Sequence, residues 1–225
     1  LVKAMCNMMK EAGGVNTDKA SKIKSGQLFG IEMYNKVFAL ACANMMIHKD
    51  GKTNLALLDA REKDAGEWIK WEKTPTKFDD DGKPVDGVLR NITKVLMNPP
   101  YERKYGCMKI VKNVLDSVPK GTPCAFILPD KKLEKDGADK KYGNKILKDH
   151  TLKTIIKMPE NLFLNGTTPS IFVFEAGRPQ GNDNVIGYYI EDDGLETVKN
   201  KGRQDIKNRW ESKEDYWIKA IHDGN

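Results

Sequence analysis

The sequence predicts a doubly wound α/β fold with a mostly parallel sheet, and two observations carry this prediction. Apolar runs of strand length alternate along the chain with segments of helical periodicity, the order that gives parallel strands joined by crossover helices. The composition, 39% hydrophobic and 31% charged over 225 residues, is that of a globular protein long enough for a well-buried core.

The first half of the chain predicts two parallel strands that both end near an acidic residue. Its expected elements are a helix at 1–12 stopped by two glycines, a strand at 28–31, a helix at 35–48 and a strand at 54–58. Glu32 follows the first strand and Asp59 follows the second. Parallel strands meet ligands at their carboxyl ends, so both acids are candidate binding residues. Between 61 and 91 the periodicity is lost, which predicts a long loop.

The second half restores the alternation of strands and helices. Its expected elements are a strand at 94–97, a helix at 107–118, a strand at 124–128, a short helix at 144–148, and strands at 152–158, 171–175 and 185–190. No helical segment separates 152–158 from 171–175, which predicts an antiparallel pair at the edge of the sheet. Residues 1–178 are expected to form one catalytic domain, with 179–225 as a polar, partly helical C-terminal extension anchored by Trp210 and Trp217.

The stretch Asn98-Pro99-Pro100-Tyr101 directly follows the apolar run 95–97, which we expect to be a buried strand. Proline fixes its own backbone and restricts the residue before it, so a rigid loop is expected here. The Asn98 amide oxygen and the Pro99 carbonyl oxygen can accept both hydrogens of an aromatic amine, while the Tyr101 ring can stack on the base. The alternative is a plain proline turn with a buried tyrosine.

The two strand-end acids have an equally concrete chemistry. A carboxylate at the position of Glu32 can accept hydrogen bonds from both hydroxyls of a ribose, and Asp59 can accept the exocyclic amine of an adenine. Either residue is, alternatively, an exposed acid at the end of a strand.

Cysteine and histidine content argues against disulfides and a metal site, whereas the charge leaves the role of one basic segment open. The net charge is +6, and residues 101–160 carry 14 basic against 8 acidic side chains. Lys131, Lys132, Lys135, Lys140 and Lys141 either contact a phosphate backbone or simply solvate a loop. Cys6, Cys42, Cys107 and Cys124 have apolar neighbours and no C-x-x-C spacing, so reduced core thiols are expected, and the three scattered histidines give no metal site. A membrane-spanning run and a signal segment are not evident, so a cytoplasmic protein is expected.

Taken together, these segments resemble a known family of amino-group methyltransferases that use S-adenosylmethionine. More narrowly, the chain resembles the modification subunit of type I restriction-modification systems, from Leu1 to about Arg209. The fragments that carry this resemblance are Asn98-Pro99-Pro100-Tyr101, Phe29-Gly30-Ile31-Glu32, Ala41-Cys42-Ala43-Asn44-Met45, Asp50-Gly51-Lys52-Thr53-Asn54, Ile127-Leu128-Pro129, and Ile155-Ile156-Lys157-Met158-Pro159 with Phe163.

The resemblance implies a Rossmann-like methyltransferase sheet and N6-adenine methylation of DNA. It implies that Asn98, Pro99, Pro100 and Tyr101 form the catalytic loop, that Glu32 holds the cofactor ribose and that Asp59 holds the cofactor adenine. The expected partners are DNA and the specificity and restriction subunits of a type I complex, because the sequence shows no base-reading module of its own.

The resemblance also implies that the family's first strand and glycine-rich cofactor turn should lie immediately before Leu1. We therefore expect the isolated chain to bind S-adenosylmethionine weakly and to be inactive by itself. Two other functions remain open: a methyltransferase acting on a protein glutamine or an RNA base, and a non-catalytic interaction module with a nucleotide-binding fold.

Overall fold

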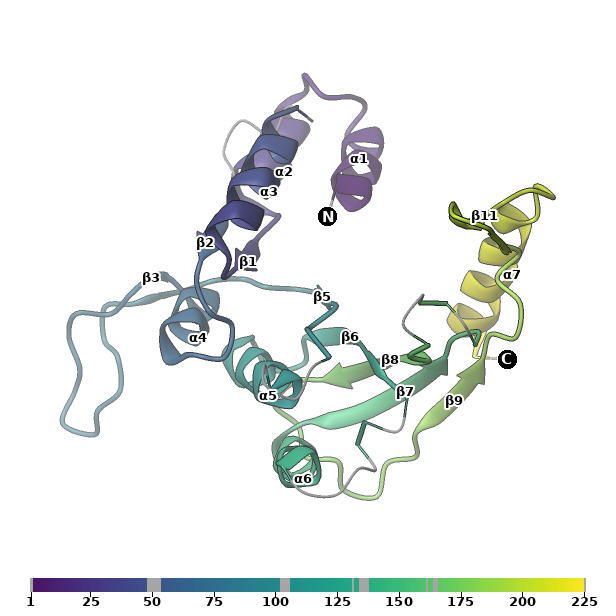
Figure 1. Cartoon of the computed structure of the whole chain (residues 1–225). Coiled ribbons are helices and arrows are strands. Elements are labelled where there is room, and N and C mark those ends of the chain that lie inside the picture. Colours follow the sequence, from purple (N-terminus) through teal and green to yellow (C-terminus); the bar gives the residue numbers. More distant parts are fainter. Residues whose placement is uncertain are drawn as a thin grey trace. The chain divides into compact units, whose positions relative to one another are not determined.

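The computed structural model describes residues 2–47, 54–101, 106–130, 132–133, 138–160, 162–163 and 166–224, with the side chains of 2–6 and 138–140 left aside. The chain divides into two compact units, Leu1–Trp68 and Ile69–Asn225. Each unit is described by itself below. Figure 1 labels the helices and strands along the chain.

The first unit is a small helical layer beside two short parallel strands. Its elements are α1 (Val2–Glu11), α2 (Asp18–Gly26), β1 (Gly30–Glu32), α3 (Asn35–Ile47), β2 (Leu55–Leu57) and the start of α4 (Lys63–Lys70). Helix α2 was not predicted from the sequence. It begins at Thr17, whose Oγ1 accepts a hydrogen bond from the Ala20 N–H at 3.1 Å and donates one to the Ala12 carbonyl at 3.0 Å.

The core of the first unit is made by residues from three helices. Met9, Ala12, Ala20, Ile23 and Met45 form one buried cluster. Strands β1 and β2 pair in parallel, with Gly30 opposite Leu55 and Glu32 opposite Leu57. The predicted crossover of strand, helix and parallel strand is therefore confirmed. The turn between α3 and β2, at 48–53, lies outside the described residues.

The segment from 61 to 91, predicted as a loop, contains regular structure. Helix α4 crosses the boundary of the two units, and strands β3 (Trp71–Lys73) and β4 (Val88–Leu89) pair in antiparallel fashion. The Asp86 carboxylate accepts hydrogen bonds from the N–H groups of Thr76 and Lys77, at 2.7 and 2.9 Å, which fixes the arm of this hairpin. The loop prediction was wrong because these strands are too short to show a period.

The second unit is built on a five-stranded sheet. Its strands are β5 (Val95–Met97), β6 (Pro123–Pro129), β7 (Thr151–Lys157), β8 (Pro169–Glu175) and β9 (Ile186–Tyr189). The strand order is β5-β6-β8-β7-β9 (Figure 1). Helices α5 (Cys107–Ser117) and α6 (Ala138–Asp149) connect successive strands and pack against each other. The α/β class is confirmed.

The antiparallel strand lies inside this sheet, which corrects the prediction of an antiparallel edge strand. β8 pairs in antiparallel fashion with β6 on one side and with β7 on the other, whereas β5 with β6 and β7 with β9 are parallel pairs. Four strands therefore run in one direction and only β8 runs against them. The missing helix between β7 and β8 signals a hairpin, but the hairpin's place in the sheet depends on long-range pairing.

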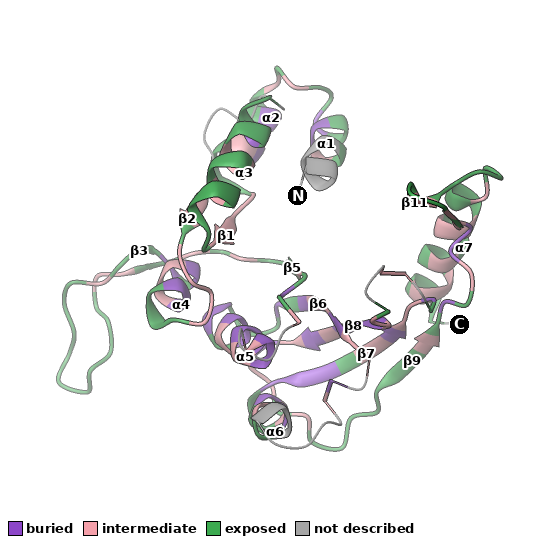
Figure 2. Ribbon diagram, viewed as in Figure 1, coloured by how far each residue is buried: buried purple, intermediate pink, exposed green. Residues whose placement is uncertain are grey.

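One face of this sheet forms the main core of the second unit. Cys124, Phe126 and Leu128 of β6 are buried, and the register places Phe174, Phe172 and Ser170 of β8 directly opposite them. Residues directly opposite each other share a face, so these six side chains form a continuous row. Figure 2 shows the buried positions concentrated in α5 and in the central strands. Seven of the eleven residues of α5 are buried.

Strand β5 is less buried than predicted. The register puts Leu96 opposite Ala125, on the face away from the row described above, and its side chain is 79% exposed. Among the described residues, β5 pairs with β6 alone. The apolar run therefore marked a strand correctly, but its central side chain is not in the core.

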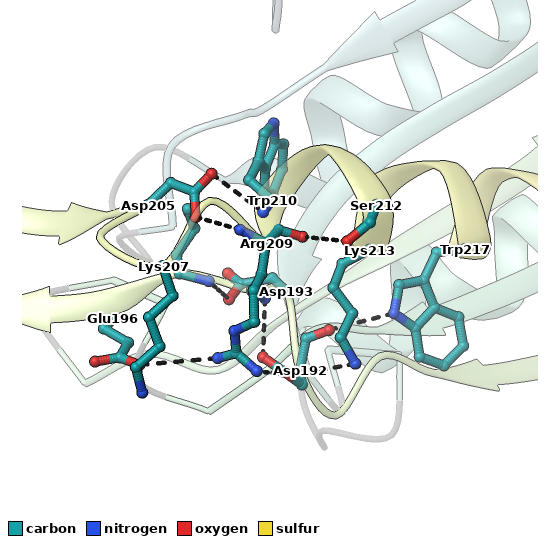
Figure 3. Close-up of polar contacts among 12 residues, drawn as sticks. Asp192, Asp193, Glu196, Asp205, Lys207, Arg209, Trp210, Ser212, Lys213 and Trp217 are labelled. Atoms are coloured by element: carbon teal, nitrogen blue, oxygen red, sulfur yellow. Dashed lines mark hydrogen bonds and ion pairs between the residues drawn. The ribbon is translucent and has the colours of Figure 1, made fainter.

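The C-terminal part contains a hairpin, β10 (Glu196–Val198) with β11 (Gly202–Gln204), and helix α7 (Trp210–Asp223). Ionic contacts hold these elements together (Figure 3). Asp192 pairs with Arg209 at 3.3 Å and with Lys213 at 3.2 Å, while the Asp205 carboxylate accepts from the backbone N–H of Arg209 at 2.7 Å at the start of α7. Gly194 is required here, because a Cβ at this position would meet the Arg209 backbone at 2.9 Å.

The two tryptophans of this region have different roles. The Trp217 Nε1–H donates to the Asp192 carbonyl at 3.3 Å, so this residue anchors α7 as predicted. Trp210 is exposed and is held through its backbone N–H instead. Strand β9 belongs to the central sheet through its pairing with β7, and the predicted division at residue 178 stays a prediction. Across the described residues, the helices are too short or too polar to span a bilayer.

Candidate active site

The loop Asn98 to Tyr101 leaves the carboxyl end of β5. Asn98 and Pro100 are exposed, Pro99 is buried and Tyr101 is half-buried. Because Met97 lies opposite Phe126 in a parallel pair, the loop starts beside the last residues of β6. The structure therefore places the asparagine amide in solvent reach at the carboxyl edge of the sheet, with the proline between it and the tyrosine buried.

The Tyr101 ring lies against Phe163, a residue from the connection between β7 and β8. The ring centroids are 6.0 Å apart and the planes are inclined at 62°, an edge-to-face arrangement. The Tyr101 hydroxyl is buried, and no described residue forms a hydrogen bond with it. Burial raises the pKa of Tyr101, and the neighbouring Cys107 thiol raises it further. The phenol is therefore a neutral donor at physiological pH.

Glu32 and Asp59 lie at the carboxyl edge of the parallel pair in the first unit. The Glu32 carbonyl accepts a hydrogen bond from the Leu58 N–H at 3.1 Å, which places the residue before Asp59 beside Glu32. The Glu32 side chain is turned back onto its own chain: Oε1 accepts from the Tyr34 N–H at 2.8 Å. Both candidate cofactor-binding acids are half-buried.

Asp59 is held by Arg61, a residue that the sequence did not single out. The Arg61 Nε donates to Oδ1 at 2.8 Å and to Oδ2 at 2.9 Å, Nη2 makes a further contact with Oδ2, and the Arg61 backbone N–H donates to Oδ1 at 3.0 Å. The Asp59 hydrogen bond raises the pKa of Arg61. The spacing Asp-x-Arg after a strand was the only signal for this pair.

The candidate residues thus fall into two groups. Glu32 and Asp59 share one sheet edge in the first unit, whereas the residues from Asn98 to Tyr101 belong to the second unit. Within each unit, the residues lie where a parallel pair of strands ends. The contact of Phe163 with Tyr101 is new information, because the sequence analysis named Phe163 only in a fragment that carries the family resemblance.

The basic segment after β6 is only partly described. Lys132 is buried, so it does not solvate a loop, while Lys141 is exposed on α6. Lys131 and Lys135, and the side chain of Lys140, lie outside the described part. For the other four lysines, both interpretations stay open.

Two of the three described thiols, Cys107 and Cys124, lie in the core as predicted. Cys107 and Cys124 are free and buried, and Cys42 is free and half-buried, while the side chain of Cys6 is among those left aside. Burial raises the pKa of the Cys124 thiol to about 12, so it stays protonated and unreactive. Within the described residues, no group of three His, Cys, Asp or Glu side chains could hold a metal ion.

Solved structures with a similar arrangement of elements include modification subunits of type I restriction enzymes. The chain matches the M protein of the type I restriction enzyme EcoKI with a TM-score of 0.66 and 14% identity, over 96% of this chain and 46% of that one. It matches a modification subunit of a putative type I restriction enzyme from Vibrio vulnificus YJ016 with a TM-score of 0.68 and 17% identity. This match covers 99% of this chain and 46% of that one. The fold is therefore that of Rossmann-like methyltransferases.

Sequence comparison narrows this class. The pattern of the N-6 DNA methylase family matches residues 110–223, about half of the chain, and the chain belongs to this family. It is 30% identical over 215 residues to the type II restriction enzyme and methyltransferase RM.BcgI of Heyndrickxia coagulans, covering 90% of this chain. The chain spans 30% of that relative and less than half of the two modification subunits. The family match begins after the Asn98 loop.

Proposed function

We propose that this chain carries the catalytic loop of a cytoplasmic, S-adenosylmethionine-dependent DNA methyltransferase that modifies the N6 amine of adenine within a restriction-modification system. The observation that carries the proposal is the loop from Asn98 to Tyr101 at the carboxyl end of β5, with the Phe163 ring against Tyr101, in a member of the N-6 DNA methylase family. The similarity to the modification subunits supports the same function.

Glu32 and Asp59 of the first unit suit the ribose and the adenine of the cofactor. Oε1 of Glu32 accepts one backbone hydrogen bond, and no described residue donates to Oε2, so this oxygen suits a ribose hydroxyl. The Asp59 carboxylate, oriented by Arg61, suits the exocyclic amine of the cofactor adenine. The bound cofactor would supply an electrophilic methyl group.

The loop supplies the acceptors for the target amine. The amine of adenine is a weak nucleophile because its lone pair is delocalised into the ring. Two oxygens, Oδ1 of Asn98 and the Pro99 carbonyl, would accept its two hydrogens and favour the pyramidal form, in which the lone pair is available. As the new N–C bond forms, the methyl–sulfur bond of the cofactor would break with its electron pair left on sulfur, giving S-adenosylhomocysteine, and the amine would lose one proton. Neither amide oxygen is basic enough to keep it, so the proton passes to water.

The aromatic pair suits a base that has left the duplex. An adenine inside a duplex cannot bring its amine to a rigid loop, so the target nucleotide must be extruded. Tyr101 and Phe163 would give the extruded base an aromatic wall, and stacking on aromatic side chains contributes about 1–3 kcal/mol per base. We infer that specificity and restriction subunits complete the enzyme, because the chain is similar to modification subunits of type I restriction enzymes.

A labelling experiment tests this proposal. The complete gene product, purified with any subunits that accompany it, is incubated with methyl-labelled S-adenosylmethionine and with unmodified DNA, RNA or protein. We expect label in DNA alone, located at N6 of adenine. Label confined to RNA or to protein glutamine would identify the other methyltransferase function, and label in no substrate would favour a non-catalytic interaction module.

A further inference from the structure

The connection that carries Phe163 is held at its far end by two side chains from neighbouring strands. The hydroxyl of Ser170, a buried residue of β8, donates to Oδ1 of Asp130 at 2.9 Å. Asp130 directly follows β6, and its backbone N–H donates to the Thr168 carbonyl at 2.8 Å. Asp130 therefore holds the chain on both sides of Pro169, at the point where the connection enters β8.

This clamp, defined by Asp130 and Ser170, lies at the same sheet edge as the candidate catalytic loop. In the β6–β8 pair, Leu128 is opposite Ser170 and Pro129 is opposite Pro169. In the β5–β6 pair, Met97 is opposite Phe126, so the chain beyond Met97 leaves the sheet beside the residues that lead to Asp130. The Tyr101–Phe163 contact joins the two segments.

Phe163 is tied by its backbone to a residue that lies shortly before the clamp in the sequence. The Gly166 N–H donates to the Phe163 carbonyl at 3.1 Å, and Gly166 has a positive φ of 69°. On the other side of the connection, the Met158 N–H donates to the Pro169 carbonyl at 3.2 Å. Because the Phe163 carbonyl is bonded to Gly166, four residues before Ser170, a shift where the chain enters β8 would be passed to Phe163.

The position of Ser170 argues for more than general stabilisation. It occupies the same face as Phe172 and Phe174, where an apolar side chain would pack without cost. A buried hydroxyl is tolerated only when it is hydrogen-bonded, and it then fixes one geometry. Here the geometry that it fixes is that of the Asp130 carboxylate next to the Phe163 connection.

We propose that Asp130 and Ser170 are positioning residues that set the Phe163 ring against Tyr101 for the extruded base. Neither residue needs to touch the substrate. The proposal rests on the proposed function, because it assigns the two rings to the target base. It predicts that breaking the clamp impairs base capture and methyl transfer while cofactor binding is preserved.

The test compares Ser170→Ala, Asp130→Ala and Asp130→Asn with a matched control, Ser117→Ala. Ser117 is also a buried serine of the second unit, and its hydroxyl donates to the Asn113 carbonyl at 2.6 Å within α5. The complete gene product is assayed on a duplex whose methylated adenine has been mapped. Steady-state kinetics, cofactor affinity and the fluorescence of 2-aminopurine placed at the target position are measured, together with the thermal midpoint.

Ser170→Ala and Asp130→Ala should each lower kcat about tenfold, the equivalent of one hydrogen bond of about 1.4 kcal/mol, and reduce the 2-aminopurine signal. Cofactor affinity should change less than about twofold. Asp130→Asn keeps an oxygen acceptor for Ser170 and should stay within about threefold of the parent, and Ser117→Ala should keep the parental kcat.

Parental kcat and fluorescence in both Ser170→Ala and Asp130→Ala would overturn the proposal, as would an equal loss in Ser117→Ala. If Asp130→Ala fails to fold, the other two variants test the proposal, which then requires Ser170→Ala to be impaired and Asp130→Asn to be active. A parent that methylates adenine while these variants are unaffected refutes the positioning role alone. A parent that leaves adenine unmethylated refutes the proposed function itself.

Discussion

Replacing His150 with alanine should destabilise the second unit, because this side chain is buried and hydrogen-bonded at both ring nitrogens. The imidazole is 3% exposed and is engaged at both nitrogens. Its Nδ1 accepts a hydrogen bond from the Gly177 N–H at 2.9 Å, so Nε2 carries the proton and donates to the Asp116 carboxylate, also at 2.9 Å. The side chain thereby ties the end of α6 to α5 and to the turn after β8.

The expected loss follows from these two contacts. A hydrogen bond to a carboxylate contributes about 1.5–3 kcal/mol, and the half-buried Gly177 N–H left without its acceptor costs about 1 kcal/mol, the low end of the range for an unsatisfied donor. We therefore expect His150→Ala to lower the free energy of unfolding by about 3 kcal/mol. For a unit of this size, that corresponds to a fall of about 10 °C in the thermal midpoint.

Thermal unfolding followed by circular dichroism at neutral pH measures this effect. The control is His222→Ala, because the His222 side chain is 86% exposed near the end of α7. Its midpoint should stay close to that of the parent, since exposed substitutions usually change stability by less than about 0.5 kcal/mol. A midpoint for His150→Ala within about 2 °C of the parent would refute the assignment of this histidine as a buried tie.

Three further predictions concern acid, packing and the cofactor. Burial by itself raises the pKa of Asp116, but hydrogen bonds from His150 and Lys112 hold this pKa below its ordinary value of 3.8. The carboxylate therefore stabilises the fold above pH 3.8, and this contribution is lost as the pH falls below that value. Asp116→Asn should flatten the acid-unfolding profile in this range, and an unchanged profile would contradict the assignment. Trp217→Phe removes the hydrogen bond to the Asp192 carbonyl and should cost about 1 kcal/mol in urea unfolding, whereas an unchanged midpoint would show that this bond contributes nothing. Arg61→Ala removes the side chain that orients the Asp59 carboxylate. Calorimetry should show S-adenosylmethionine binding to the complete gene product weakened about three- to tenfold. Equal affinities of the variant and the parent would exclude an orienting role for Arg61.

Local patterns in the sequence were sufficient for most long elements. Helix α5 was predicted within one residue because its apolar side chains repeat at helical spacing, and β6 and β8 were predicted from continuous apolar runs. Helix α2 was missed because only Ala20 and Ile23 of its nine residues are buried. Such a helix depends on its Thr17 cap and on packing against α1 rather than on a visible apolar face.

The arrangement of the sheet could not be read in the same way. The apolar runs of β7 and β8 predict two strands and their hairpin connection, but not that β8 inserts between β6 and β7. Strand order depends on pairings between residues far apart in the chain, such as Leu128 with Ser170. A local pattern carries no information about these pairings.

The same distinction applies to the candidate site. The loop from Asn98 to Tyr101 is a contiguous motif, so it could be recognised before its surroundings were known. The contact of Phe163 with Tyr101 and the hydrogen bond from Ser170 to Asp130 come from segments that meet only through the sheet register. The sequence therefore offered the candidate reacting groups, while the structure added the contacts on which the proposed positioning role rests.

The amount of N6-methyladenine formed in DNA by the complete gene product, with and without Asn98→Ala, tests the central claim most directly. The amide oxygen of Asn98 is expected to stabilise the transition state as one of two fixed acceptors, and removing one such group costs about a hundredfold or more in kcat. Asp130→Asn, analysed in parallel, should remain active. We predict that Asn98→Ala folds as the parent does and forms almost no N6-methyladenine; methylation at the parental rate by this variant would contradict the account.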